Sequence, residues 1–306
     1  MNHGPLIFLG AFATVVSSFW GLVVAPQLQL GGLQPKLTTG GDAVYPSQRP
    51  GLAAQGHAVY VANGCVYCHS QQIGQSGVEF DVRLVKGGTN AVKTLARLRE
   101  VLPDLSDDSA RQMIATATNT APQLLAAGLD HATADLLDRN LKPTGAQVQI
   151  VQRNLGPDLA RHWGRRLSVA QDYLYDDPVQ LGTQRIGPDL ANYGLRQTNE
   201  TVILTHLLNP RAVEKNSTMP GYSFLFERRK LHPGETTPAI SLSAAGITQD
   251  VDKTTGAPEF FVPKPAARAL AAYLMSLQSD APLFEAPLPA PPPVAAAGTN
   301  APAPVK

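Results

Sequence analysis

A Cys-x-x-Cys-His run is the feature that most constrains this chain. The run is Cys65-Val66-Tyr67-Cys68-His69, and it contains both cysteines of the 306-residue sequence. This pattern is typical of covalent c-type haem attachment, in which each thiol bonds one vinyl group and the histidine binds the iron. The alternatives are half of a zinc site, a dithiol redox pair or chance, but no further cysteine completes a zinc site and the flanks predict helix. We therefore predict one covalently bound haem c, held by Cys65 and Cys68, with His69 as an axial iron ligand.

The N-terminus predicts a membrane anchor. Residues 5–35 carry no charged side chain, and residues 5–26 are mostly apolar, which is long enough to span a bilayer as a helix. A cleaved signal peptide is the alternative, but a basic n-region is missing and the nearby Ala-x-Ala lies within the apolar run. We expect a single-pass, uncleaved anchor at 5–26 in a bacterial cytoplasmic membrane and a linker at 27–52. Haem c is attached outside the cytoplasm, so the remaining chain is expected in the periplasm.

Composition indicates which partners to expect. The net charge is +1 and no Lys/Arg-rich run occurs, so no nucleic-acid partner is expected. Residues 280–306 are rich in Pro and Ala without periodicity, which predicts a disordered tail.

Two predicted helices resemble the terminal helices of class I c-type cytochromes. They cover residues 53–63 and 265–277, and each carries a small or apolar residue with an aromatic: Gly56 with Tyr60, and Leu270 with Tyr273. The resemblance implies that the two helices cross. We expect a mainly α class I cytochrome c domain formed by 53–78 and 152–279, after an N-terminal transmembrane helix.

Residues 79–151 predict a small α+β insertion in the order βααβαβ. Alternating or apolar segments occur at 79–85, 122–129 and 147–151, and helical periodicity at 91–101, 107–118 and 132–141. Stretches at 80–84, 89–93, 134–137 and 145–148 resemble the C-terminal domain of the large-subunit ribosomal stalk protein. That family's Gly-Leu-Gly turn is replaced by residues 102–105 (Leu-Pro-Asp-Leu), so the resemblance implies the fold and not ribosomal factor binding. A docking module and an insertion without a role remain equal alternatives.

A second axial ligand is expected, because two strong ligands keep a haem iron low-spin in both redox states. Met1 is on the wrong side of the membrane, Met113 lies in the insertion and Met275 on the last helix. Met219 lies in a loop before Pro220 and resembles the methionine ligand of class I cytochromes. We assign Met219, with a histidine or an open position as the alternatives.

Further site residues follow from a loop at 185–190. Gly187-Pro188 resembles the class I element whose proline carbonyl orients the proximal histidine, so Pro188 is expected to hold His69. A near-copy at 155–160 is expected to be an ordinary turn. Arg185, Arg196 and Arg211 either pair with haem propionates or are solvated. His57, His162 and His206 are expected to be core or surface residues.

The combined motifs resemble subunit II of the cbb-type haem–copper oxidases, the membrane-anchored mono-haem cytochrome c of that complex. The matching segments are 64–72, 168–176, 185–191, 206–211 and 219–222. The resemblance implies a non-catalytic electron relay in aerobic respiration. Electrons would come from a c-type donor through a di-haem cytochrome c subunit and pass to the catalytic haem–copper subunit I.

Three other functions remain open. The small cytochrome c subunit of a membrane nitric-oxide reductase shares the anchor and haem motif but not the features at 70–72 and 209–211. A free-standing anchored cytochrome c is the second. The third is a haem-based sensor or docking protein, which would leave one iron position open.

Overall fold

The computed structural model describes residues 3–41, 43–49, 51–232, 234, 235, 239–241, 244, 246 and 259–289. The chain divides into two compact units. The first comprises the chain up to Gln72 together with Ser168–Glu285, and the second comprises Ile73–Leu167 and the chain from Ala286 onward. Residues 290–306 of the tail predicted at 280–306 lie outside the described residues.

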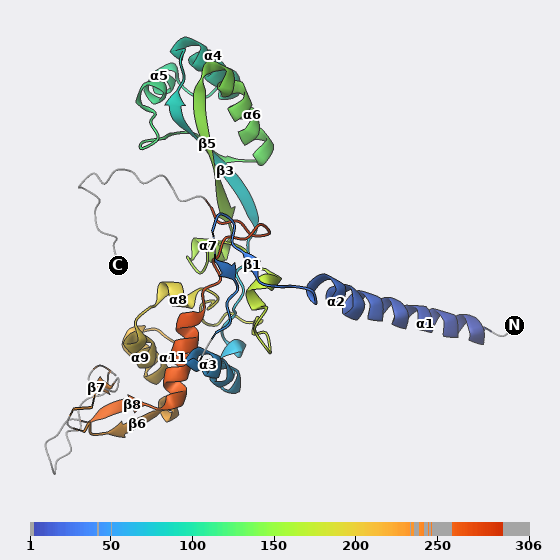
Figure 1. The fold of residues 1–306 in the computed structure, drawn as a ribbon, viewed down its shortest axis with the longest axis vertical. Coiled ribbons are helices and arrows are strands. Elements are labelled where there is room, and N and C mark those ends of the chain that lie inside the picture. Colours follow the sequence, from blue (N-terminus) through green and yellow to red (C-terminus); the bar gives the residue numbers. More distant parts are fainter. Residues whose placement is uncertain are drawn as a thin grey trace. The chain divides into compact units, whose positions relative to one another are not determined.

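The N-terminal segment forms one long apolar helix. Helix α1 (Gly4–Phe19) continues through a π-helical turn at Trp20–Val24 into α2 (Ala25–Leu30), and the three lie in line in Figure 1. Together they make 27 helical residues with a mean hydropathy of 2.0 over the most apolar window. The helix runs past the predicted end at residue 26, and Pro26, which cannot donate a backbone hydrogen bond, lies directly after the π-helical turn. This helix fits a single-pass membrane anchor.

The core of the first unit forms where α3 (Gly51–Ala62) packs against α11 (Pro265–Ser276), side by side in Figure 1. Gly56 permits the close approach, since a Cβ there would lie 1.9 Å from the carbonyl oxygen of Ala269. The rings of Tyr60 and Tyr273 meet at the same crossing, 5.3 Å apart. Helix α9 (Glu200–Leu208) adds four buried aliphatic side chains to this core.

The rest of the first unit consists of short elements. Strands β1 (Lys36–Leu37) and β2 (Val44–Tyr45) form a hairpin, and an antiparallel sheet has the order β6-β8-β7. The remaining bounds are β6 (Phe226–Arg229), β7 (Ile240–Ser241), β8 (Phe260–Pro263), α8 (Tyr193–Arg196) and α10 (Pro210–Val213).

The second unit contains a three-stranded antiparallel sheet with three helices packed on it. The elements in chain order are β3 (Gly77–Gly87), α4 (Ala91–Val101), α5 (Asp107–Thr116), β4 (Gln123–Leu129), α6 (His131–Leu141) and β5 (Ala146–Leu155). Strand β3 is central, with β4 and β5 on its two sides. The core includes Val82, Leu84, Leu98 and Leu137, all buried. The first and last strands of the predicted block, β3 and β5, extend further than expected, because Gly77 pairs with Leu155 at the end of their ladder.

Ordered structure reaches into the predicted tail. Leu283 is 2% exposed, and the Lys36 ammonium lies 2.7 Å from Oε1 of Glu285. The backbone N–H of Thr39 also donates to the carbonyl oxygen of Pro282 at 2.9 Å. The prediction of disorder from residue 280 was therefore wrong for 280–289, because Leu283, which lies among the prolines of this segment, is buried in the first unit.

Candidate haem site

A cavity of about 580 Å³ lies in the first unit, beside the Cys-x-x-Cys-His run. Its volume is within the range of cofactor sites. The sequence-predicted residues on its wall are Cys65, Cys68, His69, Pro188, Arg196 and Met219. The wall is otherwise largely apolar and aromatic, with Tyr60, Ile186, Leu190, Tyr193, Ile203, Leu207, Val213, Tyr222, Leu270 and Leu274.

The local backbone explains why both thiols and the imidazole lie on one wall. Helix α3 ends at Ala62, and Gly64 then adopts the left-handed region with φ 64°. A 3₁₀ turn follows at Cys65–Tyr67, and the backbone N–H of His69 donates to the carbonyl oxygen of Cys65 at 3.0 Å. The turn brings the three side chains of the motif together at the cavity.

The His69 ring is oriented by a hydrogen bond to the backbone of Pro188. Its Nδ1 lies 2.8 Å from the carbonyl oxygen of Pro188, so the tautomer protonated at Nδ1 leaves the Nε2 lone pair free. Burial lowers the pKa of His69, although the bond to Pro188 acts in the opposite direction. A neutral imidazole with an orienting acceptor is the form that binds a metal.

Asp189, next to Pro188, fixes the chain that follows His69. Its buried carboxylate accepts from Ser70 Oγ at 2.6 Å, from the N–H of Gln72 at 2.7 Å and from the N–H of Ala191 at 2.8 Å. The loop at 185–190 is thus bonded directly to the haem motif.

The near-copy of this loop lies in the second unit and does not line the cavity. Its Asp158 is buried as well and accepts from the N–H of Gly74 at 2.7 Å. The motif contains a short helix, α7 (Pro157–Ala160). Both copies use a buried aspartate to hold chain that leaves the haem motif, and only the later copy approaches His69.

Among the methionines, Met219 lies on the cavity wall. The N–H of Tyr222 donates to the carbonyl oxygen of Leu207 at 2.7 Å, which ties the Met219 loop to α9. Met275 packs at the core of the first unit without lining the cavity, and Met113 packs in the second unit. His69 and Met219 are therefore brought to one cavity.

The three arginines differ in position. Arg196 lines the cavity, donates to the carbonyl oxygen of Asp189, and has its pKa lowered by burial. Arg185 instead donates to Ser70 Oγ at 2.9 Å and to the carbonyl oxygen of Gln72 at 2.5 Å. Arg211 is exposed on α10 and, like Arg185, does not line the cavity. Arg196, and not Arg185 or Arg211, is available to an anionic group in this cavity.

His206 and Glu214 also line the cavity. The sequence analysis expected His206 to be a core or surface residue and did not single out Glu214. Burial lowers the pKa of His206, with His69 acting in the same direction and Glu214 in the opposite one. The helical spacing contained a signal for His206. It lies three residues after Ile203, so both side chains are on the helix face that lines the cavity.

Cys65 and Cys68 are half-buried free thiols. No disulfide joins Cys65 and Cys68, and burial raises the pKa of the Cys65 thiol to about 11. A thiol with a raised pKa is a poor nucleophile at neutral pH, which disfavours a dithiol exchange pair. Two thiols, one imidazole and one thioether in an otherwise largely apolar wall are the donor set that suits a haem c.

Comparison with known proteins assigns the family. Residues 146–277 match the family model described as cytochrome c oxidase, mono-heme subunit/FixO. This region belongs to the mono-haem cytochrome c oxidase subunit family. The matched residues include Pro188, Arg196 and Met219, whereas Cys65–His69 precede them. No curated protein matches the chain. The FixO family is the mono-haem cytochrome c subunit of the cbb-type oxidases, so the match supports haem binding and is consistent with an electron-transfer role.

Proposed function

We propose that this chain carries one haem c, bound covalently through Cys65 and Cys68, and relays electrons from a c-type donor to the haem–copper catalytic subunit. The observation that carries the proposal is the placement of His69 and Met219 on the wall of one cavity that also presents both cysteines. When bound, the haem supplies a reversible one-electron carrier.

The protein's own groups define how such a carrier would behave. His69 and Met219 would hold the haem iron through an imidazole and a thioether, and this ligand pair would raise the reduction potential relative to two histidines. The carbonyl of Pro188 fixes the imidazole ring at 2.8 Å, which makes it a better donor. Arg196 supplies positive charge to the propionates.

The placement of the chain follows from the anchor. Helix Gly4–Leu30 would hold the first unit at the periplasmic surface of the bacterial cytoplasmic membrane, since haem c is attached outside the cytoplasm. The proposed partners are the catalytic subunit I and a di-haem cytochrome c subunit of the oxidase. The second unit is proposed to be a separately folded insertion of the type seen in the ribosomal stalk C-terminal domain.

Replacing the axial methionine tests the haem ligation. In Met219→Ala, the near-infrared charge-transfer band of Met–Fe ligation should be lost while the haem stays covalently attached. Met113→Ala is the matched control, because Met113 packs in the second unit, and it should retain the band. A five-coordinate, ligand-binding iron in the wild type would contradict the relay and favour a sensor.

Purification tests the complex. The full chain, tagged at its C-terminus and extracted from membranes, should co-elute with a polytopic haem–copper subunit. If the chain elutes alone with its haem, the oxidase assignment fails and a free-standing cytochrome takes its place.

A further inference from the structure

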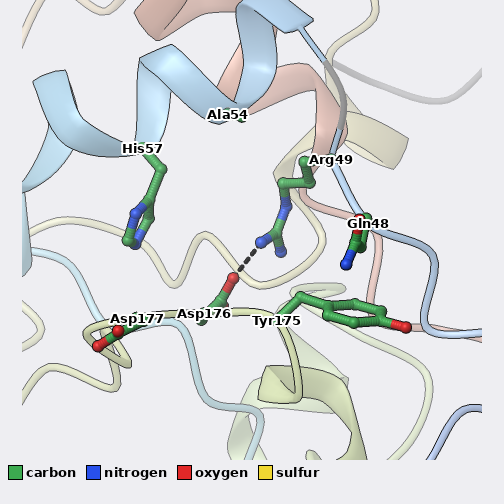
Figure 2. A pocket seen from close by; sticks show the side chains of 7 residues that line it. All are labelled: Gln48, Arg49, Ala54, His57, Tyr175, Asp176 and Asp177. Atoms are coloured by element: carbon green, nitrogen blue, oxygen red, sulfur yellow. Dashed lines mark hydrogen bonds and ion pairs between the residues drawn. The ribbon is translucent and has the colours of Figure 1, made fainter.

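A second, polar pocket of about 220 Å³ lies in the first unit. It shares no lining residue with the haem cavity. Figure 2 shows His57 entering it from α3 and Arg49 from the segment before that helix, while Tyr175, Asp176 and Asp177 lie on the facing loop. The volume is several times the ~30 Å³ that one water occupies in the liquid, so the pocket has room for more than a bridging water.

One ion pair in the pocket is already complete. Arg49 is bonded to Asp176 (Figure 2), whose side chain is 3% exposed. The guanidinium carbon of Arg49 also lies 5.4 Å from the centre of the Tyr273 ring. The charges of Arg49 and Asp176 therefore offset each other and hold one wall of the pocket.

His57 and Asp177 are two further polar side chains of the lining. The His57 ring packs edge-on against Tyr273 with centroids 5.3 Å apart, and its Nε2 is buried without a hydrogen-bond partner. Within the described part of the chain, no hydrogen bond or ion pair involves Asp177, which is exposed at the rim. A buried polar atom without a partner is rare in a native protein, so Nε2 of His57 is open to a hydrogen bond from a water or from a group that enters the pocket.

The charges select the class of that occupant. Arg49 and Asp176 offset each other, so the carboxylate of Asp177 leaves the arginine and the two aspartates of the lining with a net charge of −1, which attracts a cation. A guanidinium group has several N–H donors in a planar fork, so it can reach a carboxylate and an imidazole nitrogen at once. It also stacks on aromatic rings, and Tyr175 is 39% exposed at the same rim.

We propose that this pocket receives an arginine side chain from another subunit of the oxidase. The guanidinium donates to the carboxylate of Asp177 and to Nε2 of His57, and stacks on Tyr175. The proposal rests on the proposed function, since that function supplies the partner subunit.

Asp177→Asn tests the charge while keeping the side-chain shape. In the purified complex, retention of the catalytic subunit and of the di-haem subunit is measured against NaCl concentration, and the expected effect is on the subunit that supplies the arginine. The variant should bind roughly tenfold more weakly than the wild type, because a charge-assisted hydrogen bond is lost. The matched control is Asp104→Asn, which makes the same change at an exposed turn of the second unit and should behave as wild type. Both variants should keep the wild-type haem spectrum.

A photoreactive residue identifies the occupant. Benzoylphenylalanine in place of Tyr175 should cross-link, in the intact complex, to a peptide of another oxidase subunit that contains arginine. A peptide without arginine, or retention equal to that of Asp104→Asn, overturns the proposal. If the wild-type chain fails to co-purify with any oxidase subunit, the proposed function is what fails, so the two failures are distinguishable.

Discussion

Gly187 lies directly against the imidazole of His69. A Cβ built on Gly187 would be 2.2 Å from Cε1 and 2.7 Å from Nδ1 of that ring, while Pro188 holds Nδ1 by its carbonyl oxygen. The backbone N–H of Gly187 also donates to the carbonyl oxygen of Cys68 at 2.9 Å. The backbone of Gly187 therefore packs against the His69 ring, and any side chain at position 187 would displace that ring.

Gly187→Ala should move His69 without removing it. We expect about 1–3 kcal/mol of overpacking strain, enough to shift the balance between ligated and unligated iron by roughly tenfold or more. The visible spectrum of the oxidised protein should gain a high-spin component, while the haem stays covalently attached. Gly77→Ala is the control, because nothing lies within 4 Å of the added carbon. A wild-type spectrum in Gly187→Ala would show that His69 is not an axial ligand.

Asp158 and Asp189 allow the two Gly-Pro-Asp-Leu loops to be compared. Each carboxylate is buried and accepts at least one backbone N–H. An asparagine has one acceptor oxygen, so either Asp→Asn change should cost about 1–3 kcal/mol of stability. Asp189→Asn should also perturb the near-infrared Met–Fe band, since Asp189 follows Pro188, and Asp158→Asn should leave it unchanged. Equal spectral effects would mean that the loop at 185–190 has no special relation to the haem.

The sequence predicted a helix well where the local residues contain an N-cap and helical periodicity. The bounds of α4 agree with the expected 91–101, and this helix has an asparagine N-cap, Asn90. Strands β3 and β5 of the second unit were predicted too short, because their length depends on pairing between Gly77 and Leu155, which lie far apart in the sequence. Local periodicity does not contain that information.

The haem motif was visible in the sequence because its spacing is a local chemical requirement. The hydrogen-bond partners of the arginines could not be predicted from the sequence, because they depend on which loops contact each other in the fold. Arg185 bonds Ser70 and Gln72, more than a hundred residues earlier, and so does not reach the cavity. Leu283 shows the same limit, since a Pro/Ala-rich stretch gave no sign that one leucine is buried.

Tyr273 predicts how the first unit responds to alkaline pH. Burial raises its pKa to about 12, against about 10 in an unfolded chain. The folded state therefore binds the phenolic proton more tightly, and this contribution is fully present below pH 10 and lost as the pH rises to 12. In Tyr273→Phe, the fall in unfolding free energy between pH 10 and 12 should be smaller by roughly 2–3 kcal/mol. Urea unfolding followed by Soret circular dichroism measures it. Leu270→Val, a core change without an ionisable group, should lower stability equally at every pH, and an unchanged slope in Tyr273→Phe would contradict the prediction.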